Sequence, residues 1–154
     1  MPVRRRGLKM PVTHSAGVKA GILAGATYPQ QSYKDAQTGE MVPDKRAGMP
    51  VAVIAAAHNY GTSKVPPRPF MDQTIAAKKK EWSTGVVTLI KGGASVATAL
   101  VTVGQVMMED IQNTIQTWPA DNSKEWAEHK GFNHGLIYTH VLLRSVKFNV
   151  WGAS

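Results

Sequence analysis

The chain is 154 residues long and 43% hydrophobic, which suits a single globular domain and excludes wholesale disorder. It contains no cysteine, so disulfide frameworks, zinc–thiolate sites, iron–sulfur sites and cysteine nucleophiles are excluded. The net charge is +8, and residues 1–91 hold fourteen Lys and Arg against five Asp and Glu, whereas residues 92–154 hold four against five. This asymmetry favours contact with an anionic partner: nucleic acid, a membrane surface or an acidic protein face.

The first segment, residues 1–16, is predicted to be a basic arm, because prolines and a glycine interrupt any periodic apolar face. A single domain is expected over residues 17–154. Neither a secretory leader nor a run of roughly 20 apolar residues is visible, so we expect no membrane partner. The basic residues of the arm are Arg4, Arg5, Arg6 and Lys9.

A strand is predicted over residues 17–28, where apolar residues alternate with other types at a period of two. Residues 29–48 are polar and rich in turn formers, so we expect a long loop that orders on contact with a partner. Pro50 then opens a short helix over residues 51–60, and Gly61 ends it. The connector that follows has three prolines in four positions, which favours a rigid, extended backbone.

Two longer helices are predicted over residues 70–91 and 95–117, ended by glycines and by Pro119. Residues 145–151 alternate again and are expected to form a closing strand paired with 17–28. The predicted fold is therefore α+β, with a small antiparallel sheet packed against two longer helices and one short helix. The residues predicted to face the core on the longer helices are Met71, Ile75, Trp82, Val86, either Leu89 or Ile90, Val96, Leu100, Val103, Met107, Ile111 and Ile115.

We find no sequence pattern typical of an active site or a cofactor site. There is no phosphate-binding glycine loop and no Gly-x-Ser-x-Gly elbow. Glu109 and Asp110 are adjacent, so on a helix they point apart, and we expect both on its solvated side. We therefore expect no enzyme activity, no cofactor and no metal. The histidines that lie near acidic residues, but at spacings that match no metal motif, are His129, His134 and His140.

Two stretches together resemble a family of bacteriophage proteins. The first runs from Val51 to Thr62 and continues with Val65-Pro66-Pro67-Arg68-Pro69-Phe70-Met71. The second runs from Gly131 to His140 and continues with Leu143-Arg144-Ser145-Val146. Both are similar to motifs of the tailed-bacteriophage head–tail joining family, whose members are called neck, tail-completion, minor tail or virion morphogenesis proteins.

The resemblance implies a non-enzymatic virion protein that forms a ring in the neck, between the capsid portal complex and the tail. The implied partners are further copies of the chain, in a hexamer rather than a dodecamer, and the adjacent portal-side and tail-side proteins, with possible non-specific contact with packaged DNA. Such a protein is made in the host cytoplasm and resides in the virion. One alternative is a tail terminator that caps the tail tube. Another, supported by net charge alone, is a non-specific DNA-binding accessory protein.

Arg68 illustrates two alternatives for the proline-rich connector. Its guanidinium is held on a rigid segment, so it is suited either to a carboxylate of a neighbouring subunit or to a helix-end contact within its own subunit. The lysine run near the start of the first long helix is either a solvated surface or a contact for an anionic partner. The full set of candidate interface residues is Arg4, Arg5, Arg6, Lys9, Tyr33, Tyr60, Pro67, Arg68, Phe70, Lys78, Lys79 and Lys80.

Overall fold

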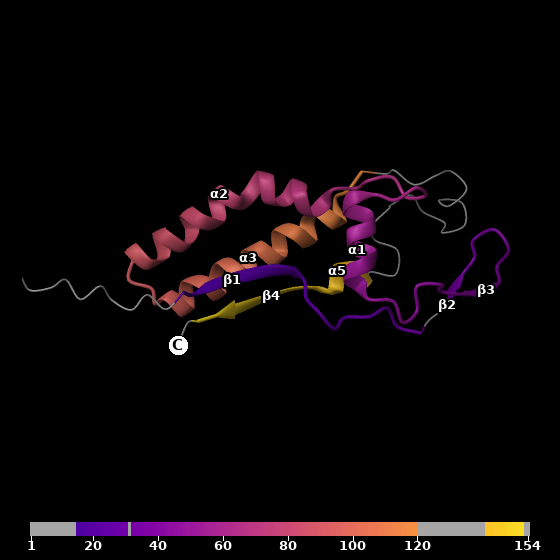
Figure 1. Cartoon of the computed structure of the whole chain (residues 1–154), viewed down its shortest axis with the longest axis horizontal. Coiled ribbons are helices and arrows are strands. Elements are labelled where there is room, and N and C mark those ends of the chain that lie inside the picture. The colour runs from indigo at the N-terminus through magenta and orange to yellow at the C-terminus, as the bar shows by residue number, and fades with distance from the viewer. Residues whose placement is uncertain (1–14, 31, 120–140, 153–154) are drawn as a thin grey trace, which may run out of the picture.

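Three layers run along the length of the molecule: helix α2, helix α3 and a two-stranded sheet (Figure 1). The computed structural model describes residues 15–30, 32–119 and 141–152. The elements in chain order are β1 (Gly17–Ile22), β2 (Ser32–Lys34), β3 (Met41–Pro43), α1 (Val51–Tyr60), α2 (Phe70–Lys91), α3 (Val96–Gln116), α5 (Val141–Arg144) and β4 (Val146–Trp151). The predicted α+β fold is thus confirmed, and the predicted helix limits agree with the observed ones to within a residue.

The sheet pairs strands from the two ends of the described chain. β1 and β4 are antiparallel, with Gly17 opposite Trp151 and Ile22 opposite Val146. The predicted alternation of β4 is confirmed, since Val146, Phe148 and Val150 are more buried than the residues between them. β1 ends at Ile22, short of the predicted residue 28. Each outer edge of this sheet lacks a strand partner among the described residues.

Helix α3 is the central layer, with the sheet on one side and α2 on the other (Figure 1). It can approach the sheet closely because Gly104 has no side chain. A Cβ built on Gly104 would lie 2.5 Å from Cδ2 of Phe148 and 2.8 Å from Cγ2 of Val18, well inside van der Waals contact. A glycine in the middle of a helix costs stability, and here the close approach of helix and sheet explains it.

The prediction that residues 29–48 form a plain loop is wrong, because this segment contains the β2–β3 hairpin. The two strands are three residues long and pair in register from Ser32–Pro43 to Lys34–Met41. The turn between them is held by Asp35, whose carboxylate oxygen Oδ1 accepts hydrogen bonds from the backbone N–H groups of Gln37 and Thr38 at 2.8 and 3.3 Å. Strands this short have too few residues to display a period of two, which is why the sequence pattern did not reveal them.

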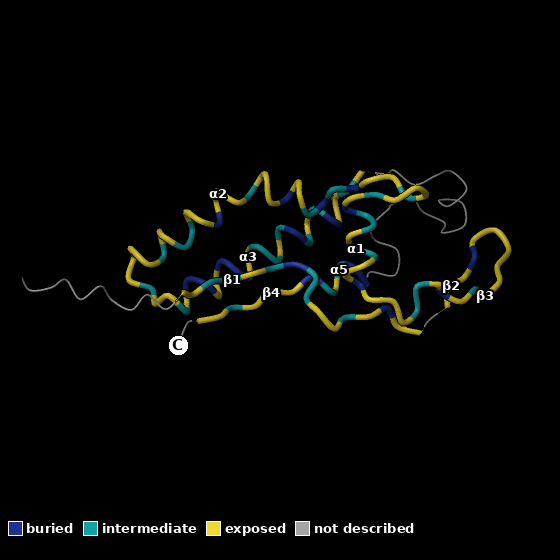
Figure 2. The backbone as a smooth tube through the Cα atoms, in the orientation of Figure 1, coloured by how far each residue is buried: buried dark blue, intermediate teal, exposed yellow. Residues whose placement is uncertain are grey.

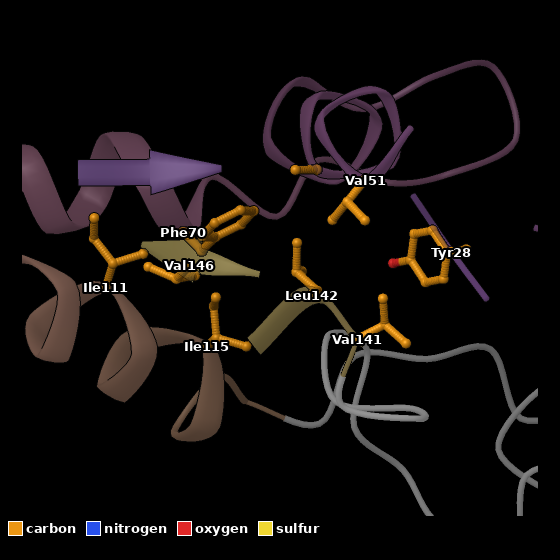
Figure 3. Close-up of a cluster of buried hydrophobic side chains, with 9 residues drawn as sticks. Tyr28, Val51, Phe70, Ile111, Ile115, Val141, Leu142 and Val146 are labelled. Carbon is orange, nitrogen blue, oxygen red and sulfur yellow. The ribbon is translucent and has the colours of Figure 1, made fainter. Parts of the chain in front are cut away.

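The core lies where α1, α5 and the C-terminal half of α3 meet (Figure 3). Phe70 and Ile111 are almost fully buried there, and Val51, Ile115 and Val146 are not exposed at all. The rest of this cluster is Tyr28, Ala55, Val141 and Leu142. The C-terminal half of α2 contributes little, because Trp82 is the last of its buried residues, and Figure 2 shows α2 exposed along its outer side.

Two residues predicted to face the core are exposed. Ile75 is 40% exposed, because Thr74 takes the inward position of that turn and donates a 2.7 Å hydrogen bond to the hydroxyl of Thr114 in α3. Val96 is 47% exposed, because it is the first residue of α3 and lies at the helix start. Among the described residues, no helix is both long enough and apolar enough to cross a bilayer.

Candidate functional site

The junction between α1 and α2 is fixed by a buried asparagine. Oδ1 of Asn59, near the end of α1, accepts hydrogen bonds from the backbone N–H groups of Met71 and Asp72 at 3.1 and 3.3 Å. These N–H groups belong to the first turn of α2, where the helix itself offers no acceptor. Asn59 therefore performs the work of an N-cap from a different helix, and it sets the angle between the two.

Arg68 lies inside the subunit, at the same junction. It is 5% exposed, its Nη1 lies 3.1 Å from Nδ1 of His58, and its backbone N–H donates to the carbonyl of His58. Of the two alternatives for Arg68, the structure displays the helix-end contact within one subunit. Because two contacts join the connector to the end of α1, the proline-rich segment is a brace between the two helices.

The other candidates in this region divide between core and surface. Phe70 is 1% exposed and belongs to the core (Figure 3), whereas Tyr60 is 73% exposed and Pro67 is also exposed. Tyr60 also lines a small cavity of about 180 Å³ between α1, the end of β1 and the start of α2. Tyr60 and Pro67 are thus the two candidates of the connector region available for contact with another molecule.

An apolar groove of about 720 Å³ runs between the C-terminal half of α2 and the N-terminal half of α3. It exists because α2 presents small side chains toward α3, which leave space beside the larger residues. The small residues are Ala77, Thr84, Gly85 and Thr88, and the apolar walls are Leu89, Val103 and Val106. Val106 is 43% exposed and Ile90, at the end of α2, is 41% exposed. Apolar surface gathered in this way is typical of an interaction site.

Trp82 lines the groove and is hydrogen-bonded across it. Its indole Nε1–H donates a 2.7 Å hydrogen bond to Oδ2 of Asp110. The prediction that Glu109 and Asp110 both lie on the solvated side is correct for Glu109 and wrong for Asp110, which is partly buried. A period of 3.6 turns adjacent residues apart, and only Asp110 turns toward α2.

The run of three lysines in α2, residues 78–80, directly follows Ala77, the first α2 residue that lines this groove. Lys79 and Lys80 are exposed, and Lys80 lines the groove itself. Nζ of Lys78 lies 3.4 Å from a carboxylate oxygen of Glu81 in an exposed ion pair, which stabilises little. The charged residues that line the groove are thus Lys80 and Glu81, and Glu81 is the partner of Lys78 in that ion pair.

The β2–β3 hairpin is fastened at its base. Nε and Nη2 of Arg46 donate to Oδ1 and Oδ2 of Asp44 at 3.0 and 3.1 Å, and the same guanidinium lies 4.7 Å from the centre of the Tyr28 ring. Backbone hydrogen bonds join Tyr28 to Gly48 and Met49 beside this pair. Burial raises the pKa of the Tyr28 hydroxyl, an effect that Arg46 opposes and Asp44 reinforces. The hairpin thus projects from a rigid base.

Several predicted features lie outside the described residues. They are the basic arm with Arg4, Arg5, Arg6 and Lys9, the histidines at 129, 134 and 140, and the part of the second family motif over residues 131–140. Tyr33 lies in β2, and its side chain is likewise outside the description. In the part of the chain that is described, no three His, Asp or Glu side chains come together in a group that could hold a metal ion.

Comparison with known proteins adds no relative. No family model matches the sequence, and no curated protein or solved structure is significantly similar to it.

Sequence reasoning missed the groove, Asn59 and the hairpin. Each depends on which residues meet across the fold, and a helical stripe does not reveal that. The run of small residues at 84, 85 and 88 was the one available signal for the groove, because small side chains on an inward face leave space.

Proposed function

We propose that the chain is a structural protein of a tailed-bacteriophage virion that forms a ring in the neck, where the capsid portal complex joins the tail. The observation that carries the proposal is the open apolar groove between α2 and α3 with its exposed neighbours. An assembly protein needs an apolar surface for contact with its partners. Exposing that surface to water is unfavourable in an isolated subunit, so association that covers it is favoured.

The sequence motifs support the same function. The connector Pro66-Pro67-Arg68-Pro69-Phe70 is the more specific part of the resemblance to head–tail joining proteins, and it lies between α1 and α2 as a brace with Arg68 and Phe70 turned inward. A subunit that bears load between capsid and tail gains from such a fixed angle. In a closed ring each subunit uses two different faces, so its contacts are heterologous.

Mass spectrometry of purified particles and immunogold labelling test this function. We expect the chain in intact virions, at the junction of head and tail, and we expect a discrete multimer of the purified protein by light scattering. Deletion of residues 1–12 should impair head–tail joining if the basic arm contacts a neighbouring ring. Absence of the chain from particles would overturn the proposal, and labelling at the end of free tails would favour the tail terminator.

The competing proposal is a DNA-binding accessory protein. The observation that favours it is the exposure of Lys79 and Lys80, which could contact phosphate groups. Affinity for DNA measured against salt separates the two, since neutralising several phosphates makes binding fall steeply from low to moderate salt. A monomer with such a slope would favour the accessory protein.

A further inference from the structure

The β2–β3 hairpin has no further strand or helix packed against it among the described elements of one subunit. Its strands pair only with each other among the described elements, and Met41 is 64% exposed. A two-stranded hairpin of this size has little stability of its own in water. Here the contacts of Asp44, Arg46 and Tyr28 fix the base of the hairpin, and the apolar side chain of Met41, the first residue of β3, is exposed to solvent.

The groove between α2 and α3 is the apolar recess that such a hairpin could fill, but not in its own subunit. The hairpin lies at one end of the molecule, beyond α1, and the groove-lining part of α2 lies toward the other end (Figure 1). The base of the hairpin is fixed next to the start of α1 by backbone hydrogen bonds of Tyr28 with Gly48 and Met49, and by the pairing of Thr27 with Pro50. The hairpin cannot reach the groove of its own subunit, so a hairpin that fills this groove belongs to another copy of the chain.

Charge complementarity supports a second copy as that occupant. Glu40 directly precedes Met41, is exposed, and its carboxylate makes no ion pair with the described residues. Two charged residues line the groove: Glu81 is paired with Lys78, whereas Lys80 has no ion pair within the described part of the chain. The hairpin also carries Lys34, opposite Met41, but the unpaired carboxylate of Glu40 is opposite in charge to the unpaired Lys80 of the groove.

We propose that the β2–β3 hairpin of one copy docks into the α2–α3 groove of the next, with Met41 as the apolar anchor and Glu40 facing Lys80. The hairpin and the groove lie at different places on the subunit, so the contact is heterologous. Such a contact repeats from copy to copy until a ring closes. This inference rests on the proposed function, because it identifies the subunit contact of the ring.

Cross-linking between engineered cysteines tests the contact directly, since the natural chain has none. Full-length M41C and full-length V106C are purified separately, mixed, and treated with a short bis-maleimide. We expect a cross-linked dimer in the mixture and a ladder of multimers from the double variant M41C/V106C. The matched control replaces V106C by V53C, because Val53 is a comparably exposed helical valine on α1, outside the groove. Equal cross-linking of V53C and V106C with M41C, or none, overturns the contact.

Charge reversal gives a second and independent readout. E40K and K80E alone should each raise the concentration at which half the chain is assembled by roughly fivefold, and E40K/K80E together should restore it. Additive losses in the double variant overturn the pairing of Glu40 with Lys80. Circular dichroism confirms that each variant is folded.

The outcomes separate this contact from the proposed function. A chain that is present in particles and multimeric, but cross-links V106C to V106C rather than to M41C, keeps the function and overturns the docking of the hairpin. A chain that stays monomeric at all concentrations overturns the docking, and its absence from particles overturns the function as well.

Discussion

The indole N–H of Trp82 in α2 donates a 2.7 Å hydrogen bond to the carboxylate of Asp110 in α3. Trp82 is the last buried residue along α2, and this bond joins the middle of that helix to its neighbour. Beyond it the interface contains small side chains and the open groove. The position of α2, and hence the shape of the candidate interaction surface, depends on this pair.

Replacing Asp110 by Ala should lower the free energy of unfolding by about 1–3 kcal/mol, because the buried indole N–H loses its acceptor. Urea denaturation followed by circular dichroism measures the loss. The control is E109A, since Glu109 is exposed and its carboxylate accepts a hydrogen bond from the exposed Gln105 side chain. This variant should change stability by less than about 0.5 kcal/mol. Equal losses in the two variants would contradict the structural role of Asp110.

Replacing Gly104 by Ala should destabilise the fold by about 1–3 kcal/mol, because the new Cβ would meet Phe148 at 2.5 Å and α3 would have to move away from the sheet. G85A is its matched control in α2, where the Cβ would lie 3.5 Å from Cγ2 of Val103, an ordinary contact. G85A should therefore gain up to about 1 kcal/mol from helix propensity. Thermal unfolding of both variants measures the difference, and a G104A protein as stable as G85A would show that helix and sheet are not tightly packed.

Replacing Asn59 by Ala should cost about 1–2 kcal/mol, because two N–H groups in the first turn of α2 lose their acceptor. N113A is the control, since Asn113 lies exposed on α3 and the same substitution there raises helix propensity. Denaturant unfolding of the two variants provides the measurement. A loss no larger in N59A than in N113A would mean that Asn59 does not cap α2.

Alkaline pH should destabilise the protein in part through Tyr28. Burial raises the pKa of its hydroxyl in the folded state, so the unfolded chain loses this proton first, near pH 10. Stability from Tyr28 is thus complete below about pH 10 and falls as the pH rises toward the folded pKa. Melting temperatures from pH 8 to 11 should fall less steeply in Y28F, which lacks the ionisable hydroxyl at this position. Parallel curves for the two proteins would refute a buried, neutral Tyr28.

The helices could be predicted from sequence because local signals mark their ends. Pro50 and Gly61 flank α1, and Ser95 caps α3 with its hydroxyl accepting from the N–H of Thr98 at 3.1 Å. The partners of each face could not be predicted in the same way. The cap of α2 comes from Asn59 on another helix, and Ile75 is exposed because Thr74 bonds to Thr114 across the interface.

The features of the candidate site also differ in how far the sequence predicts them. The connector and the lysine run are visible as sequence patterns, and both lie where the helices start or where α2 faces solvent. Met41 and Glu40 were not predicted, because a polar, turn-rich segment gives no sign of which apolar residue it presents. Arg68 was open to two interpretations, and only its contact with His58 within the subunit decides what the described chain does with it.

The pairing of β1 with β4 bears on how the chain is made. β1 leaves the ribosome among the first described residues, but its partner strand ends at Trp151, so translation must reach that residue before the sheet can close. Until then Val18 and Ala20 have no strand beside them, although α2 and α3 are already synthesised. Synthesis that stops ahead of residue 146 would therefore release a polypeptide with an uncovered α3, a natural substrate for chaperones and proteases.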